Sequence, residues 1–257
     1  MGMLLEKRKD NLQVRVYSSR EEMGAAAAAA AADCLRSLLE EKETVNAVFA
    51  AAPSQNETLD ALAQEPGIDW NRVNAFHMDE YVGLDPRAPQ AFGQFLRDRL
   101  FGKVKFKSVN YIKGTAADIE AECARYSRAL RKAKPDIVCM GIGENGHIAF
   151  NDPHEAFFFD SKAVKVVTLD EKCRMQQVHD GCFDSLSLVP THAVTLTIPS
   201  LMAPEYVFCV VPAPTKADAV YTMLKGEIGE YCPCTVLRRH GNSVLYTDKD
   251  SAKRILV

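Results

Sequence analysis

The sequence predicts an α/β fold in which a doubly wound, mostly parallel sheet carries helices on both faces. Apolar runs of the kind found in strands buried on both faces recur along the 257 residues. Amphipathic stretches lie between several of these runs, and strands that alternate with helices favour a parallel sheet. The chain shows no linker, repeat or break in composition, so we expect a single domain over residues 1–257.

The first predicted elements are a strand over 13–18 and a helix that opens at Ser19 and continues through Met23 to about Glu41. The stretch Ser19-Arg-Glu-Glu22 matches a capping box, which typically opens a helix. An alanine run at 25–32 lies inside this helix. Alanine is the best helix former and has a small side chain, so we interpret the run as a surface that packs closely against the sheet.

Six further apolar runs predict strands, and three amphipathic stretches predict helices. The strands are expected at 45–53, 73–78, 136–143, 164–169, 193–199 and 206–212, and the helices at 89–101, 116–133 and 215–225. This order of elements is typical of a Rossmann-like sheet.

Composition and charge exclude several partners. Hydrophobic residues make up 47% of the chain and charged residues 25%, which are ordinary values for a globular protein. A net charge of -3 provides no broad positive surface, so we expect no nucleic-acid partner. No run reaches the ~18 apolar residues of a membrane helix, and the N-terminal residues lack the apolar core of a signal peptide. We therefore expect no membrane partner and a cytoplasmic protein.

The eight cysteines are spread along the chain, and several lie inside apolar runs, which indicates reduced core residues. The one close pair, Cys232-Pro-Cys234, has no second pair at the spacing of a zinc site and is not a redox C-x-x-C motif. We expect no metal site there.

Candidate functional residues follow the predicted strands. In a parallel sheet of this kind, ligands bind beyond the carboxyl ends of the strands. The segments at those ends are 53–58, 79–81, 144–147 and 214–216, and most of the side chains capable of acid-base or anion-binding chemistry lie there.

The stretch GIGENGHIAFNDP at 141–153 contains the pattern G-x-G-x-x-G, which raises the question of a dinucleotide cofactor. That role requires the third glycine to open a sizeable helix. Here Asn151-Asp-Pro153 predicts a turn that ends any helix early. We therefore expect neither a nicotinamide nor a flavin cofactor.

The same stretch offers an acid-base pair. Asp152 follows His147 by five residues across a tight chain reversal, a spacing that lets a carboxylate reach the imidazole. Such a partner fixes the tautomer and makes the histidine a proton shuttle near neutral pH, although a buried histidine bonded to backbone is the alternative.

A second cluster, Phe76-His-Met-Asp-Glu-Tyr81, ends an apolar run in two adjacent carboxylates. If Asp79 and Glu80 face one pocket, desolvation and like charge raise at least one pKa toward the working range of an acid or base. The alternative is an aspartate that caps the following turn.

Together these two stretches resemble the glucosamine-6-phosphate deaminase (isomerase) family, part of a superfamily that includes 6-phosphogluconolactonase. The matching segments come in the order of that family: MDEYVGL at 78–84, ECARYS at 122–127, GIGENGHIAFNDP at 141–153, LDEKCR at 169–174, LTIPSLM at 196–202 and the segment of Lys216. The lactonase branch is expected to lack Met-Asp-Glu-Tyr and to continue differently after the histidine. The chain is therefore more similar to the deaminases.

The resemblance implies conversion of glucosamine 6-phosphate and water to fructose 6-phosphate and ammonia, by ring opening, an aldose-to-ketose proton shift and loss of the amine. It implies that Asp79 moves the proton between C2 and C1, that His147 handles the ring-oxygen proton, and that Asp152 orients His147. No redox step occurs, so no cofactor is expected. Glu80 either tunes Asp79 or bonds to backbone.

The resemblance also implies a phosphate site. Arg174, on a candidate lid, and Lys216 match the phosphate-binding arginine and lysine of the family, and charge-assisted contacts of this kind are among the stronger polar ones. The family's glycine-rich turn is replaced here by residues 53–58. Ser54, Gln55, Asn56 and Thr58 are candidate donors, which requires Glu57 to point elsewhere.

Two further positions depart from the family pattern. Asn145 stands where many members have aspartate, which suggests altered tuning of His147, and Asp152 stands where glutamate is usual, which demands a closer turn. Some members are hexamers regulated by an N-acetylated sugar phosphate, but residues 154–160 do not match that site, so we do not expect this regulation. Assembly into a homo-oligomer stays open.

Three alternatives to glucosamine 6-phosphate deamination remain. The substrate could be the galacto epimer, because the sequence does not separate the two sugars. The chain could be a hydrolase of the 6-phosphogluconolactonase type. It could also be a sugar-phosphate-binding regulator without turnover, an alternative motivated by Asn145 and the glycine-free segment at 53–58.

Overall fold

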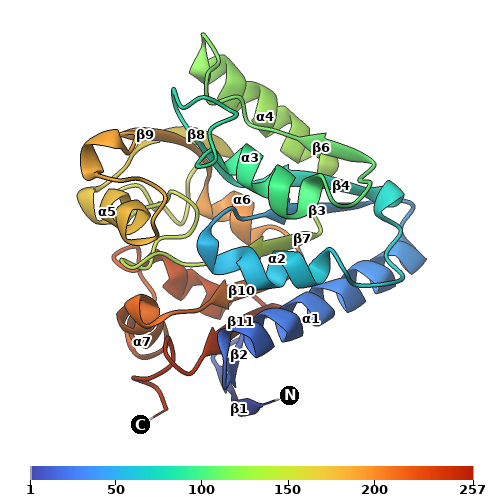
Figure 1. Ribbon diagram of the computed structural model, residues 1–257, viewed down its shortest axis with the longest axis vertical. Helices are drawn as coiled ribbons and strands as arrows, with labels where there is room; N and C mark the ends of the chain where they lie inside the picture. Colours follow the sequence, from blue (N-terminus) through green and yellow to red (C-terminus); the bar gives the residue numbers. More distant parts are fainter. Residues whose placement is uncertain (1, 257) are drawn as a thin grey trace.

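The computed structural model describes residues 2–256, which contain an eight-stranded sheet and a separate three-stranded sheet. The large sheet has the order β1-β2-β11-β10-β7-β3-β4-β6 (Figure 1). Its strands are β1 (Met3–Lys9), β2 (Leu12–Tyr17), β3 (Val45–Phe49), β4 (Val73–His77), β6 (Ser108–Asn110), β7 (Ile137–Met140), β10 (Tyr206–Val211) and β11 (Ser243–Asp248). All neighbours are parallel except β1 and β2, which confirms the predicted mostly parallel sheet.

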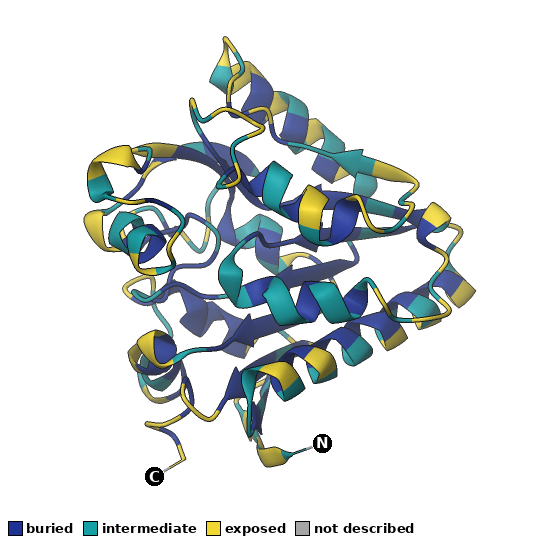
Figure 2. Cartoon of the chain, in the orientation of Figure 1, coloured by how far each residue is buried: buried dark blue, intermediate teal, exposed yellow. Residues whose placement is uncertain are grey.

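Helices cover both faces of this sheet, as predicted. The helices are α1 (Arg20–Glu41), α2 (Asn56–Leu62) and α3 (Phe92–Leu96) on one face, and α4 (Ile119–Ala133), α6 (Ile198–Met202) and α7 (Ala217–Lys225) on the other, with α5 (Glu171–His179) outside the sheet. Successive residues of β3 point to opposite faces. Val48 packs in the hydrophobic cluster of α4, and Phe49 packs in the cluster of α1. Figure 2 shows the resulting buried strands between helices whose outer sides are exposed.

The first helix begins where the sequence predicts, at the capping residue Ser19. The Ser19 hydroxyl accepts a hydrogen bond from the Glu22 backbone N–H at 3.2 Å. The Glu22 carboxylate does not return to Ser19, as a full capping box requires, because it bonds to Ser18 and to the Gly2 N–H instead. The buried face of α1 contains Ala27, Ala28, Ala31 and Ala32, which confirms the predicted packing role of the alanine run.

Three strands lie outside the large sheet, although the apolar runs at 164–169 and 193–199 were expected to join it and no strand was expected at 79–81. β5 (Asp79–Tyr81), β8 (Val164–Thr168) and β9 (His192–Leu196) form a small antiparallel sheet. Apolar periodicity identifies a strand but does not identify its partner. The expected strand at 193–199 also ends early, because α6 begins at Ile198 with Pro199 in its first turn, a position that suits proline.

Several elements differ from the sequence prediction or were missed. β1 was not predicted because an exposed edge strand carries few apolar residues, and the three-residue strand β6 and the six-residue strand β11 were not recognised. The helix expected at 89–101 is α3 followed by a wider π-helical turn at Arg97–Phe101. Within residues 2–256, none of the helices combines the length and apolar character needed to cross a membrane.

The strand order defines where a ligand would bind. From β3 the chain continues to β4 and β6 on one side, whereas from β7 it continues to β10 and β11 on the other. Connections that leave in opposite directions create a crevice beyond the carboxyl ends of the two central strands, and ligands of doubly wound sheets bind there. The crevice lies after Phe49 and after Met140.

Candidate active site

A small cavity lies at this switch point. Its volume is about 50 Å³, and its lining residues are Ala50, Ala51, Ala52, Ser54, Gln55, Met78, Asp79, Phe92, Gly141, Ile142, Ala149, Phe150 and Gln176. They come from the loops after β3, β4 and β7 together with α3 and α5. Of the predicted site residues, Asp79, Ser54 and Gln55 therefore lie in one cavity.

Asp79 begins β5, where the chain passes from the large sheet to the small one. Its side chain is 6% exposed, and its Oδ1 atom has no hydrogen-bond partner among residues 2–256. Burial, together with the charge of Glu80, raises the pKa of Asp79 well above its usual value. A carboxyl group with a raised pKa can take up and return a proton closer to neutral pH, which suits a general base.

His77, which the sequence interpretation did not assign, holds the backbone of Asp79. The Ile112 N–H donates to His77 Nε2 at 2.9 Å, so the proton of the neutral ring is on Nδ1, which donates to the Asp79 carbonyl at 2.8 Å. Burial lowers the pKa of His77 to about 4, so the ring stays neutral at neutral pH. The sequence signal that could have identified His77 is its position two residues before Asp79.

Glu80 points away from the cavity of Asp79, because consecutive residues of a strand face opposite sides. Its carboxylate accepts hydrogen bonds from the backbone N–H groups of Tyr81, Phe92 and Gly93 at 2.9–3.1 Å. Burial raises the pKa of Glu80, and these three bonds oppose the rise. Of the two roles left open, backbone bonding is the one that these contacts support, with a charge effect on Asp79 besides.

His147 lies in the turn that follows β7. The ideal Cβ position of Gly143 is only 2.1–2.4 Å from three atoms of the His147 ring, so only glycine leaves room for the imidazole there. His147 Nδ1 lies 2.8 Å from Asn145 Oδ1 and 3.1 Å from Asp152 Oδ1. With Nδ1 as the donor to these oxygens, Nε2 is the atom left for a substrate.

Asn145 and Asp152 form a network that reaches the start of α5. Asn145 Nδ2 donates to Asp152 Oδ1 at 2.9 Å and to Asp170 Oδ2 at 3.1 Å, and Asp170 caps α5. Burial favours a higher pKa of Asp152, but the hydrogen bond and charge of His147, with the Asn145 amide, hold this pKa below its usual value. An aspartate at 145 would add a third carboxylate to the cluster, so the neutral amide suits this chain.

Two connections bring the segments of Asp79 and His147 to the same edge. Asp79 pairs with Thr195 across β5 and β9, and the Thr195 hydroxyl accepts a hydrogen bond from Phe150 N–H at 3.1 Å, three residues after His147. Cys173, on the neighbouring α5, lies near both segments: burial raises the pKa of its thiol, and so do the charges of Asp152 and Asp79. His147 itself is not among the residues that line the cavity.

Lys216 follows β10 and is 3% exposed. Its Nζ atom has no hydrogen-bond partner in the described part of the chain. Burial lowers the pKa of Lys216, and the charges of Asp180 and Glu144 oppose this effect. A buried cation without a partner is unfavourable unless an anion binds it, so this lysine is suited to hold a phosphate.

Arg174 lies on α5 and is half-buried. Its Nη2 donates to the carbonyls of Leu186 and Val189 at 2.7 and 2.9 Å, and its Nε is buried without a partner among residues 2–256. Part of the guanidinium therefore fixes the loop after α5, and the Nε–H remains for a ligand.

The glycine-free segment at 53–58 turns its negative charge away. Glu57 Oε1 bonds to Arg20 Nε at 2.7 Å, and the same arginine bonds to the Pro53 carbonyl. Within residues 2–256 the buried side-chain oxygens Asn56 Oδ1 and Thr58 Oγ1 have no partner. The condition that Glu57 point elsewhere is met by its ion pair with Arg20.

Gln176 is a cavity residue that the sequence interpretation missed. Its Oε1 accepts a hydrogen bond from Glu144 N–H at 2.9 Å, so α5 holds the turn that carries His147. Glutamine is common on helix surfaces, and no sequence signal separates this one from its neighbours.

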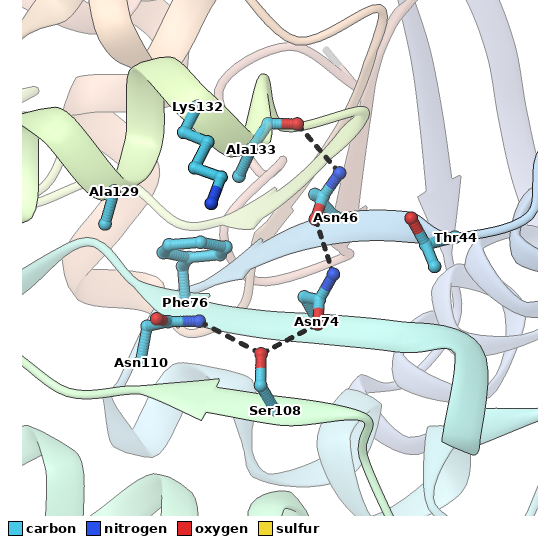
Figure 3. Close-up of a pocket in the computed structure, with 9 residues that line it drawn as sticks. All are labelled: Thr44, Asn46, Asn74, Phe76, Ser108, Asn110, Ala129, Lys132 and Ala133. Atoms are coloured by element: carbon cyan, nitrogen blue, oxygen red, sulfur yellow. Dashed lines mark hydrogen bonds between the residues drawn. The ribbon is translucent and has the colours of Figure 1, made fainter.

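A larger cavity, of about 410 Å³, lies at the opposite ends of the strands (Figure 3). Asn46 bonds to Asn74 at 2.9 Å, and Ser108 bonds to Asn74 at 2.7 Å, so the polar side chains there satisfy one another. Lys132 is the one charged residue among the nine described residues that line this cavity. Without a carboxylate or imidazole it offers no acid-base chemistry, so the smaller cavity is the candidate active site.

Three buried atoms of metal-binding type also gather near the site. Ligand atoms of His147, Asp152 and Cys173 lie within 4.8 Å of one another. The first two bond to each other, and burial raises the pKa of the Cys173 thiol well above its usual value, which keeps it in the protonated form that metals bind poorly. The arrangement fits proton transfer better than metal binding.

Comparison with known proteins identifies relatives of the chain. The model of the family described as glucosamine-6-phosphate isomerases/6-phosphogluconolactonase matches residues 18–246. The glucosamine-6-phosphate deaminase of Exiguobacterium sp. is 37% identical over 193 residues, which cover 75% of this chain and 74% of that protein. The glucosamine-6-phosphate deaminase of Bacillus cereus strain B4264 is 38% identical over 184 residues, which cover 72% and 68%.

Solved structures show the same fold. A structure described as a monomeric glucosamine-6-phosphate deaminase aligns with a TM-score of 0.84 and 29% identity, over 93% of this chain and 98% of that one. The 6-phosphogluconolactonase of Thermotoga maritima aligns with a TM-score of 0.76 and 21% identity, over 93% and 100%. The second likeness shows the shared fold alone.

Proposed function

The chain belongs to the glucosamine-6-phosphate isomerase/6-phosphogluconolactonase family, and on that premise we propose that it converts glucosamine 6-phosphate and water to fructose 6-phosphate and ammonia. The observation that carries the proposal is the buried, unpartnered carboxyl oxygen of Asp79 in the switch-point cavity, in a chain that also holds a buried, unpartnered lysine after β10. A base and an anion site are the two features that isomerisation of a sugar phosphate requires.

The proposed reaction begins with ring opening. The Nε2 atom of His147 carries the proton to the ring oxygen, while Asn145 and Asp152 hold Nδ1 and so fix the orientation of the ring. Opening produces an aldehyde at C1, which makes the proton on C2 acidic.

Asp79 then moves a proton from C2 to C1. Its carboxylate removes the C2 proton and returns it to C1, while the amine nitrogen loses a proton and the C1 oxygen gains one, which converts the aminoaldose to the imine of the ketose. Water adds to the imine carbon. The nitrogen then takes up the proton of the added hydroxyl group, and ammonia leaves as the C–N bond breaks. The buried position of Asp79 shields this transfer from solvent, and His77 holds the Asp79 backbone.

The phosphate is bound by Lys216 and Arg174, with Ser54, Gln55, Asn56 and Thr58 as further contacts. Both cations keep a buried N–H without a partner in residues 2–256. The ion pair between Arg20 and Glu57 keeps a negative charge away from the phosphate. The cavity has a volume of about 50 Å³, which is less than a sugar phosphate needs, so we propose that α5 moves outward to admit the substrate.

Deamination is favoured over the alternatives. The curated relatives at 37–38% identity carry the name deaminase, whereas the lactonase named above shares 21% of its residues with this chain. A regulator without turnover is disfavoured because Asn145 and Glu57 both have compensating partners. We place the reaction in the cytoplasm, since all eight cysteines are free, as in a reducing compartment.

The test supplies glucosamine 6-phosphate, galactosamine 6-phosphate or 6-phosphogluconolactone to the purified protein and follows ammonia, ketose phosphate and acid release. We expect ammonia and fructose 6-phosphate from the first sugar. Asp79→Asn should lower kcat by about 10²–10⁴-fold and leave substrate binding intact, because the amide cannot accept the C2 proton.

The matched control is Asp85→Asn, which neutralises an exposed carboxylate in the loop after β5 and should leave kcat unchanged. Release of ammonia from galactosamine 6-phosphate alone would show that this sugar, and not glucosamine 6-phosphate, is the substrate. Acid release from the lactone alone, or binding without turnover, would refute the proposal.

A further inference from the structure

Two cysteine thiols lie against each other beneath the catalytic turn. Cys232 Sγ and Cys234 Sγ are 3.6 Å apart, and the two residues are separated by Pro233 alone. Both thiols are reduced and buried, with 3% of Cys232 and 0% of Cys234 exposed. Neither residue has a role in the proposed reaction.

The pair is joined to the turn that carries His147. The Cys234 N–H donates to the Gly146 carbonyl at 2.8 Å. Gly146 adopts a φ of +81°, and its ideal Cβ position is 2.6 Å from Cys232 Sγ and 3.3 Å from Cys234 Sγ. Both sulfurs therefore pack close to Gly146, the residue between Asn145 and His147, and leave no room there for a side chain.

We propose that Cys232 and Cys234 form a reversible disulfide when the protein meets a hydroperoxide, and that this bond displaces the turn of His147 and lowers turnover. Formation of the disulfide does not depend on the proposed reaction, whereas the effect of the disulfide on turnover rests on that reaction. In a reducing compartment such a bond is transient and acts as a redox signal.

The chemistry balances with one hydroperoxide for each disulfide. The Cys232 thiolate attacks one peroxide oxygen, the O–O bond breaks, and hydroxide leaves and takes up a proton to become water. The Cys232 sulfenic acid is then attacked by Cys234 sulfur, which forms the S–S bond and releases a second water. Two thiols are oxidised by two electrons, and hydrogen peroxide is reduced to two waters.

The pKa values of the two thiols differ in the direction that this order of reaction, Cys232 before Cys234, requires. The hydrogen bond from Cys234 lowers the pKa of Cys232, whereas burial raises the pKa of Cys234 well above its usual value. Cys232 also follows the exposed Tyr231 and keeps the small exposed area of the pair. Cys232 therefore reacts first, and Cys234 resolves the sulfenic acid.

Bond formation moves the turn because of distance. A disulfide places its sulfurs about 2.05 Å apart, so the two atoms must approach each other by roughly 1.5 Å. Gly146 packs against both sulfurs. The residues on either side of it, Asn145 and His147, bond to each other, and Asn145 bonds to Asp152. A displacement of only about 1 Å in a catalytic group reduces turnover strongly.

The experiment treats the folded, reduced protein with one equivalent of hydrogen peroxide, blocks free thiols with an alkylating reagent, and digests the protein with trypsin. Cleavage after Lys225 and Arg238 releases GEIGEYCPCTVLR, which contains both cysteines and no others. We expect this peptide to be lighter than its reduced form by about 2 Da, the two thiol hydrogens, and to resist alkylation. We expect kcat/KM to fall at least fivefold and to recover in dithiothreitol.

The double variant Cys232→Ser/Cys234→Ser should keep its kcat/KM under the same treatment. The matched control Cys182→Ser removes a half-buried thiol elsewhere and should behave like the wild type. Alkylation of both cysteines in peroxide-treated protein would overturn the proposal, and so would a disulfide that leaves kcat/KM unchanged. If the reduced protein releases no ammonia, the proposed reaction fails, while the peptide mass still decides whether the disulfide forms.

Discussion

At the scale of single residues, the site depends on which polar atoms have partners. Asn145 is fully engaged, because it donates to Asp152 and Asp170 and accepts from His147. Lys216 Nζ is buried and has no partner within residues 2–256. The first residue should therefore contribute mainly to stability and geometry, and the second mainly to binding.

Asn145→Asp should destabilise the fold by about 2 kcal/mol and lower kcat/KM several-fold. The change removes two donated hydrogen bonds and places a third carboxylate beside Asp152 and Asp170. Urea unfolding and steady-state kinetics measure the two effects. The control Asn242→Asp adds the same charge at an exposed position and should change neither quantity. A variant as stable and active as the wild type would show that the network is not required.

Lys216→Met should raise the free energy of unfolding by about 1–3 kcal/mol and raise KM for the sugar phosphate. A methionine of similar length removes a buried charge that has no partner, but it cannot bind phosphate. Chemical unfolding and initial rates give the two values. The exposed Lys225→Met is the matched control. Loss of stability with an unchanged KM would contradict the proposed role of Lys216.

At the scale of elements, the junction of β4 and β5 positions the carboxyl group of Asp79, which we propose as the general base. The chain leaves the large sheet after His77 and joins the small sheet at Asp79. The Tyr126 hydroxyl bonds to the backbone N–H and carbonyl of His77 at 3.0 and 2.8 Å. The backbone of Asp79 is therefore positioned through His77, which bonds to the Tyr126 side chain of α4 and to the Ile112 N–H in the loop after β6, and not by the side chain of Asp79 itself.

This junction predicts a pH dependence of stability. The His77 pKa is about 4 in the folded protein and about 6.5 in the unfolded chain. Between these values the unfolded chain binds a proton that the folded protein does not, so the contribution of His77 is fully present above about pH 6.5 and is lost as the pH falls to about 4. The loss is on the order of 3 kcal/mol.

The measurement compares the free energy of unfolding of wild type and His77→Gln at intervals from pH 4 to pH 7. The difference between the two proteins isolates His77 from the carboxylates that titrate in the same range. We expect this difference to shrink as the pH falls. A difference that stays constant over this range would mean that His77 does not stay neutral in the folded protein.

At the scale of the whole molecule, the two sheets are joined through the site. The small sheet contains Asp79, and its Leu196 N–H donates at 2.8 Å to the carbonyl of Met78, the residue that links β4 of the large sheet to β5 of the small one. The hydrophobic cluster of α4 includes Val194 of the small sheet and Val138 of the large one. The candidate active site lies where these two layers meet.

We propose that the chain is a single domain and therefore unfolds in one cooperative transition. Shared hydrophobic contacts between the sheets should prevent the small sheet from unfolding alone. Far-ultraviolet circular dichroism and the fluorescence of Trp70 should give the same urea midpoint. Two separated midpoints would show that the chain contains independent units.

The sequence allowed prediction of elements whose signal is local. The Ser19 cap, the alanine face of α1 and the apolar runs of β3, β7 and β10 each depend on neighbouring residues. β1 was missed because an exposed edge strand carries few apolar residues, and β11 was missed because its partner strand β2 lies far away in the sequence. Gln176 was missed for the same reason, since its contact with Glu144 crosses 32 residues.

The sequence by itself determined the α/β class, the family resemblance and the positions of Asp79, His147 and Lys216 after apolar runs, because periodicity and motif spacing are properties of the chain. Only the tertiary structure decided that β5, β8 and β9 form a second sheet, that Glu80 faces backbone, and that the cysteine pair lies beneath Gly146. These features depend on which segments meet in space, and that choice is made by packing of the whole chain.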